Sequence, residues 1–107
     1  MIIWSSNDKE VAEKIVFMYT LNSMLNNWWE EVILVIWGPS DRLISEDVEL
    51  QNHLKKLKNA GVKLEACIDC TEMYGVSKKL EDMGVEVKGM GAPLTEYLKN
   101  REIVITF

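Results

Sequence analysis

The two cysteines of the chain, Cys67 and Cys70, lie three positions apart at the end of an apolar run over residues 62–67. A thiolate is the nucleophile that exchanges with disulfides and persulfides, and two thiols at this spacing can also close a disulfide. We expect a strand to give way to a helix at Cys67. In an alternating β/α chain, this junction lies at the carboxyl edge of the sheet, where such folds bind ligands. Cys67 and Cys70 are therefore the candidate reactive residues.

The environment of Cys67 decides its chemistry, and two environments remain open. A cysteine buried at the end of a strand behaves as an inert, small apolar residue. A partly exposed cysteine near the amino end of a helix is ionised more easily, because the helix dipole favours the thiolate. The carboxylate of Asp69, two residues away, opposes a second negative charge.

Other chemistry has little support in the sequence. A structural zinc site needs four ligands, and besides the two cysteines the chain offers one histidine, His53, on a predicted helix. Dinucleotide-binding, P-loop and serine-hydrolase motifs are missing. We expect no metal and no cofactor. Cys67-x-x-Cys70 near a βαβ pattern allows a dithiol redox protein, although no proline precedes a strand that would face the dithiol.

Five short apolar runs predict buried strands. They cover residues 2–4, 32–37, 62–67, 85–87 and 103–106. If the strands are parallel, their carboxyl ends meet at one edge of the sheet and form a pocket beside the cysteines. The predicted pocket residues are Trp4, Ser5, Trp37, Gly38, Asp69, Gly89 and Gly91. Glycine and serine let a backbone approach a ligand closely, and the two tryptophans can form walls.

Four helices are predicted between the strands. The first begins at Asn7, with Glu10 at the capping-box spacing, and the second begins at Ser45 and ends at Gly61. The third has Asp69 as its cap and ends at Gly84, and the fourth begins at Pro93. The residues expected to face the core are Val11, Ile15, Met18, Tyr19 and Leu25 in the first helix, Leu50, Leu54 and Leu57 in the second, Met73, Val76, Leu80 and Met83 in the third, and Leu94, Tyr97 and Leu98 in the fourth.

This order predicts a single α/β domain over residues 1–107. Alternating strands and helices with short connections favour a three-layer α/β/α sandwich with a mainly parallel five-stranded sheet and about four helices. A chain of 107 residues is long enough for one hydrophobic core.

Composition narrows the classes of partner. The net charge of −5 argues against binding to nucleic acid, which requires a basic surface. The longest apolar run, Val32–Trp37, is far shorter than the ~20 residues of a membrane-spanning helix, so no membrane partner is expected. The first residues, Met1–Ser5, lack the basic region of a targeting segment, and we expect a cytoplasmic location.

At Gly61–Cys67, with its Gly-Val start and Ala-Cys end, the chain resembles the DsrE/DsrF-like family of small sulfur-relay proteins. Gly38-Pro39 after the second strand, the junction Gly84-Val85 and the last strand, Val104–Phe107, add to the resemblance. It implies a parallel α/β/α fold, assembly into homo-oligomers or related hetero-oligomers, and a cysteine that carries sulfur as a persulfide, at the position of Cys67. Cys70 is not part of the family pattern.

Three functional hypotheses follow. The first is an intracellular persulfide carrier in which Cys67 accepts sulfur from a donor protein and passes it to an acceptor protein, with Cys70 as a possible resolving thiol. The second is a non-catalytic, oligomeric module that binds a small ligand or a protein at the carboxyl edge. The third is a dithiol redox protein. Trp28 and Trp29 favour homo-oligomers, because aromatic residues are enriched at interfaces, although one of the two could pack into the core.

Overall fold

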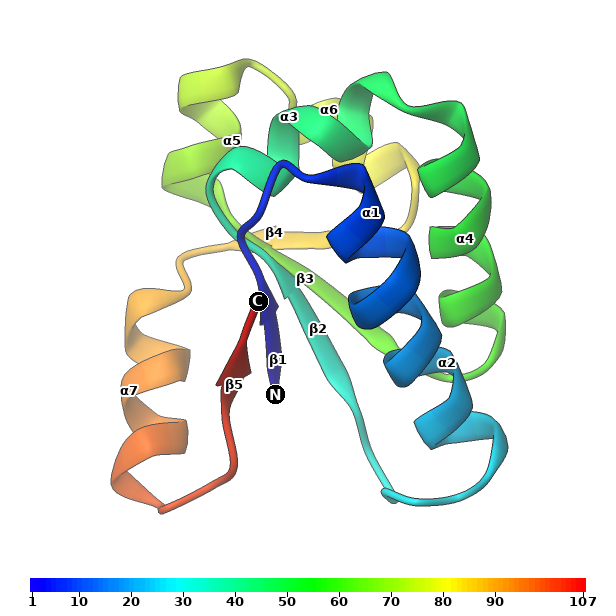
Figure 1. Cartoon of the computed structure of the whole chain (residues 1–107). Helices are drawn as coiled ribbons and strands as arrows, with labels where there is room; N and C mark the ends of the chain where they lie inside the picture. The colour runs from blue at the N-terminus through cyan, green and yellow to red at the C-terminus, as the bar shows by residue number, and fades with distance from the viewer.

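The computed structural model describes residues 1–107 (Figure 1). Parallel pairing joins all five strands into one sheet. The sheet order is β4-β3-β2-β1-β5. The strands are β1 (Ile2–Trp4), β2 (Ile33–Ile36), β3 (Lys63–Cys67), β4 (Glu86–Lys88) and β5 (Ile105–Thr106). The predicted parallel five-stranded sheet is confirmed, and each strand lies within the run expected for it or one residue beyond its end. β5 was expected to be buried but is exposed, because it forms one edge of the sheet.

The number of helices is larger than predicted. α1 (Lys9–Val11), the π-helical segment η1 (Ala12–Phe17) and α2 (Met18–Leu25) form one continuous helical segment. The others are α3 (Pro39–Glu46), α4 (Val48–Asn59), α5 (Ile68–Tyr74), α6 (Ser77–Asp82) and α7 (Gly91–Lys99). With the first three counted as one, there are six helices, and the expectation of about four is too low.

One additional helix arises between β2 and α4. Pro39 occupies the first position of α3, where the fixed φ of proline suits a helix start. Ser45, the predicted start of the second helix, is buried inside α3. The cap of α4 is instead Asp47, whose carboxylate accepts a hydrogen bond from the Leu50 amide at 3.0 Å.

The other additional helix arises because the predicted third helix breaks at Gly75. This residue has φ +70°, the left-handed conformation that glycine adopts readily, and it separates α5 from α6. Cys67, rather than Asp69, occupies the cap position of α5. The break also turns Met73 outward, where it is 84% exposed instead of facing the core.

The first helical segment differs from the prediction in its cap and in its buried face. Asp8, rather than Asn7, is the cap, and its carboxylate accepts from the amides of Glu10 and Val11 at 2.8 and 3.2 Å. Of the predicted inner residues, Val11 packs against the core. The wider turn of η1 changes the helical phase, so the other four are exposed: Ile15, Met18, Tyr19 and Leu25. The buried face carries Ala12, Val16, Phe17, Thr20 and Ser23.

The last helix begins two residues before its predicted start. α7 starts at Gly91, so Pro93 lies inside its first turn. Leu94 and Tyr97 pack toward the sheet as expected, whereas Leu98 is exposed.

Side chains alternate between the two faces of the sheet and define two apolar clusters. Ile2, Trp4, Leu34 and Leu64 belong to the larger cluster, with residues of η1, α3, α4 and α6. Ile3, Ile33, Val35 and Cys67 belong to the smaller one, with Met90 and residues of α7. Figure 1 shows α7 on one side of the sheet and α2 and α4 on the other. None of the helices combines the length and apolar character needed to cross a membrane.

Replacing Gly75 by alanine is expected to destabilise the protein by about 1–2 kcal/mol, because a Cβ is unfavourable in the left-handed conformation. No atom lies within 4 Å of an added Cβ, so the effect comes from the backbone alone. Urea unfolding measures the change. Gly91→Ala is the control, since Gly91 has an ordinary φ and equally open surroundings, and equal free energies of unfolding for the two variants would contradict the prediction.

Candidate functional site

Cys67 is the last residue of β3 and the cap residue of α5, so the strand-to-helix junction lies where the sequence predicts it. Its backbone is extended, with φ −77° and ψ 122°. The residue is 4% exposed and belongs to the smaller apolar cluster, against which Trp37 and Cys70 pack. Of the two environments that the sequence left open for Cys67, the single chain therefore provides the buried one.

Cys70 lies in the first turn of α5 and is half-buried, so it is the more accessible thiol of the pair. Burial raises the pKa of the Cys70 thiol, and the neighbouring groups of Cys67 and Asp41 raise it further. The backbone amide of Gly38 has the opposite effect on this pKa. Cys70 thus lies among three groups that interact with its sulfur: a thiol, a carboxyl group and an amide.

The turn between β2 and α3 brings Gly38 and Asp41 to the cysteines. Gly38 has φ +87° and ψ −138°, a conformation accessible to glycine. Ser40 positions this turn: its hydroxyl donates to the Trp4 carbonyl and accepts from the Trp37 amide at 3.2 Å, and its own amide donates to the Ser5 carbonyl at 3.2 Å. These bonds join the carboxyl ends of β1 and β2.

Asp41 is a buried carboxyl group that the sequence reasoning missed. It has no solvent exposure, its Oδ2 accepts from the Gly38 amide at 3.2 Å, and its Oδ1 has no hydrogen-bond partner. Burial raises the pKa of Asp41 to about 7, and the Gly38 amide only partly offsets that rise. The available signal was its place in the sequence, three residues after Gly38 at a strand end.

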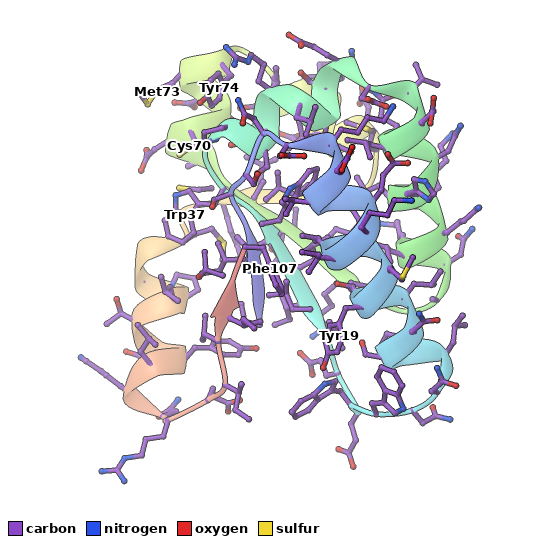
Figure 2. All side chains as sticks on the ribbon, in the orientation of Figure 1. Tyr19, Trp37, Cys70, Met73, Tyr74 and Phe107 are labelled. Carbon is purple, nitrogen blue, oxygen red and sulfur yellow. The ribbon has the colours of Figure 1, made fainter.

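The predicted pocket residues are only partly brought together. Trp37 lies beside the cysteines, and Figure 2 shows Trp37 and Cys70 at the same end of the molecule, with Tyr19 at the opposite end. Trp4 is buried in the larger cluster instead of forming a pocket wall, with its ring 5.0 Å from that of Phe17. Ser5 donates a hydrogen bond to the Phe107 carbonyl at 2.9 Å.

The remaining predicted pocket residues lie around the same edge. Asp69 is exposed in the first turn of α5, and Gly89 and Gly91 lie between β4 and the start of α7. His53 lies on α4, where its Nε2 is 3.7 Å from the Glu13 carboxylate. No group of three or more histidine, cysteine, aspartate or glutamate side chains is arranged to hold a metal ion.

A cavity of about 710 Å³ lies elsewhere, and none of the seven predicted pocket residues lines it. Eleven of its thirteen lining residues are hydrophobic. They come from the starts of β1 and β2, from η1, α2 and α7, and from the last strand, and include Ile2, Ile33, Tyr97 and Phe107. The cavity is therefore near the amino ends of the strands, away from the cysteines.

Both adjacent tryptophans are on the surface near this cavity. Trp28 and Trp29 are 57% and 45% exposed, so neither packs into the core. Trp29 donates its Nε1 hydrogen to the Tyr19 hydroxyl at 3.0 Å, and the rings of Trp28 and Tyr19 lie 6.0 Å apart. The aromatic cluster therefore projects from the amino edge of the sheet into solvent.

Comparisons with known proteins identify the family. The model of the DsrE/DsrF-like family matches residues 3–107. A solved structure, described as a conserved protein of unknown function, BT1422, from Bacteroides thetaiotaomicron, is similar with a TM-score of 0.97 and 36% sequence identity. The similarity covers 99% of this chain and 91% of that one. No curated protein matches the chain.

The raised pKa of Asp41 predicts a pH-dependent stability. Between its unfolded value of 3.8 and its folded value of about 7, the folded protein binds a proton that the unfolded chain has lost, so stability falls as the pH rises. Asp41→Asn removes this loss. Between about pH 5 and pH 8, the free energy of unfolding of the wild type should therefore fall by about 2–3 kcal/mol more than that of Asp41→Asn.

Urea unfolding at the two pH values measures this difference. Asp69→Asn is the control, because Asp69 is an exposed carboxylate of α5 and the variant should keep the pH dependence of the wild type. Equal pH dependence of the wild type and Asp41→Asn would show that Asp41 ionises normally in the folded protein.

Proposed function

Because the chain belongs to the DsrE/DsrF-like family over essentially its whole length, we propose that it is a sulfur-relay protein in which Cys67 accepts a sulfane sulfur and passes it on. The observation that carries this proposal is the place of Cys67, at the end of β3 and at the cap position of α5, with a second thiol in the next turn. This is the position at which the family resemblance implies a persulfide-carrying cysteine.

The reaction consists of two thiol exchanges. The Cys67 thiolate attacks the outer sulfur of a donor persulfide, the donor leaves as a thiolate, and Cys67 becomes a persulfide. A thiolate of the acceptor protein then attacks that outer sulfur, and Cys67 leaves as the thiolate. The sulfur is transferred without net oxidation, so the chain must supply a nucleophile, a shielded position for the persulfide and access for partners.

The 4% exposure of Cys67 favours a second candidate, a non-catalytic binding module. In the buried state the thiol cannot meet a partner, and a persulfide would form only when the start of α5 moves outward. The apolar cavity of about 710 Å³ gives such a module a site of ordinary ligand-binding size. It differs from the site predicted from sequence, because it lies at the amino edge.

Homo-oligomers are also part of the proposal, and the structure offers a surface for them. Five apolar side chains, here called the apolar edge patch, surround the mouth of the cavity. They are Ile15, Tyr19, Trp29, Ile103 and Ile105. Each is 40–67% exposed, and two of them belong to or flank β5, an edge strand whose outer backbone groups lack a neighbouring strand. An exposed, apolar sheet edge is a surface that another chain can pair with.

Incubation with a low-molecular-weight persulfide tests the relay. Intact-protein and peptide mass spectrometry should find one added sulfur atom on Cys67 in the wild type and in Cys70→Ser, and no stable loading in Cys67→Ser. Equal loading of Cys67→Ser would contradict the proposal. A Cys67–Cys70 disulfide that forms without any loaded intermediate would favour dithiol redox chemistry, and two thiols that resist persulfide and alkylating reagents alike would favour the binding module.

Ile103→Lys is expected to disrupt the proposed oligomer, because it places an unpaired charge in the apolar edge patch. We expect the dissociation constant to rise at least roughly thirtyfold, which corresponds to about 2 kcal/mol. Light scattering after size-exclusion chromatography measures the molar mass. Val48→Lys is the matched control, since Val48 on α4 is 68% exposed and Ile103 is 67% exposed. A monomeric wild type, or an oligomer unaffected by Ile103→Lys, would contradict the prediction.

A further inference from the structure

Two buried carboxyl groups have no role in the two thiol exchanges, Asp41 and Glu65. Glu65 forms an ion pair with Lys88 at 3.1 Å, whereas Asp41 has no ion pair and lies on α3, which packs against α5. We propose that Asp41 accepts the proton of Cys70 when Cys70 resolves a persulfide on Cys67, and returns that proton to the departing sulfide. The inference rests on the proposed function, because it concerns the release of a sulfur that Cys67 already carries.

The geometry places the required groups together. α3, which carries Asp41, packs against α5, whose first turn carries Cys70. The Gly38 amide donates to Oδ2 of Asp41 at 3.2 Å, and it lowers the pKa of Cys70, which the charge of Asp41 raises. Cys70 packs against the apolar cluster that contains Cys67. Oδ1 of Asp41 is buried and has no partner, which leaves a free position for a proton. A neutral carboxyl group is buried more easily than a carboxylate, so protonation of Asp41 removes an unpaired buried charge.

The surroundings leave Asp41 free to take up and release a proton. No lysine, arginine or histidine forms an ion pair with it. α3 packs against α4 and α5. The charge of Asp41 raises the pKa of Cys70 of α5, and the pKa of Asp41 itself is set by burial and by the Gly38 amide rather than by a charged group. Burial holds the pKa of Asp41 at about 7, where a group can both accept and donate a proton at neutral pH.

The proposed step conserves atoms, charge and electrons. Cys70 passes its proton to the Asp41 carboxylate, and the Cys70 thiolate attacks the inner sulfur of the Cys67 persulfide anion. The bond between the two persulfide sulfurs breaks, and the outer sulfur leaves with the electron pair and takes the proton from Asp41 as hydrosulfide. The two thiols are oxidised to a Cys67–Cys70 disulfide while the sulfane sulfur is reduced to sulfide. A thiol reductant is needed afterwards to reopen the disulfide.

Two measurements on the full chain test the role of Asp41. The first is the rate at which iodoacetamide alkylates Cys70, followed by peptide mass spectrometry from about pH 5 to pH 10. The second is the rate of sulfide release after loading with inorganic polysulfide. Asp41→Asn removes the negative charge beside Cys70, so alkylation near pH 8 should become faster. Sulfide release should become at least about tenfold slower, because the proton acceptor is missing.

These opposite changes distinguish proton transfer from a structural role, which would slow both reactions or neither. Glu46→Gln is the matched control, because Glu46 is an exposed carboxylate of the same helix, α3, and the variant should leave sulfide release unchanged. If Asp41→Asn does not fold, Asp41→Ser replaces it, since a hydroxyl can still accept from Gly38 without titrating near neutral pH. Unchanged sulfide release in either variant, or release and alkylation slowed together, would overturn the proposal.

Failure of the relay itself is recognised separately. If the wild type takes up no sulfur on Cys67 and releases no sulfide, the proposed function is contradicted. The role of Asp41 in sulfide release is then contradicted too. The alkylation profile then still decides whether Asp41 and Cys70 titrate together. A rate change near pH 7 that is present in the wild type and absent in Asp41→Asn supports that coupling, and identical profiles exclude it.

Discussion

The candidate site depends on the contacts of Ser40 more than on any other interaction. Its hydroxyl bonds to Trp4 at the end of β1 and to Trp37 just after β2, so two neighbouring strand ends are joined by one short side chain. This fixes the direction in which α3 leaves the sheet, and α3 in turn carries Asp41 over the start of α5. Parallel pairing brings strand ends to a common edge, and Ser40 turns that edge into a defined arrangement of groups.

The strands were predictable because their signal is local, whereas α3 and the phase of the first helical segment were not. Each strand lies in a short apolar run bounded by turn residues, and β1 and β2 are buried throughout, which leaves little ambiguity about their type. α3 escaped prediction because Ser40, Asp41 and Ser45 are polar and nevertheless buried, which hides the apolar period of a helix. The π-helical η1 changes the phase of the first helical segment, so a regular period selected Ile15 where Val16 is buried.

The site was predictable to the extent that it follows from one short segment. Cys67 and Cys70 are neighbours in sequence, and their junction between strand and helix can be read from local patterns. Asp41 comes together with them only when α3 packs on α5, a long-range contact with no local signature. Trp4 was wrongly predicted as a pocket wall because the sequence does not show which face of the sheet its side chain occupies. Its ring packs against Phe17 on one face, and Cys67 packs on the opposite face.

The two edges of the sheet differ in chemistry, and this separation has a functional consequence. The carboxyl edge carries two thiols, a buried carboxyl group and polar turns, whereas the amino edge carries an apolar cavity and exposed aromatic side chains. In Figure 2, Cys70 and Trp37 lie at one end and Tyr19 at the other. A second copy bound at the apolar edge patch would therefore leave the cysteines free for a sulfur donor or acceptor. Assembly at the carboxyl edge would cover them, so an oligomer compatible with the relay must leave that edge free.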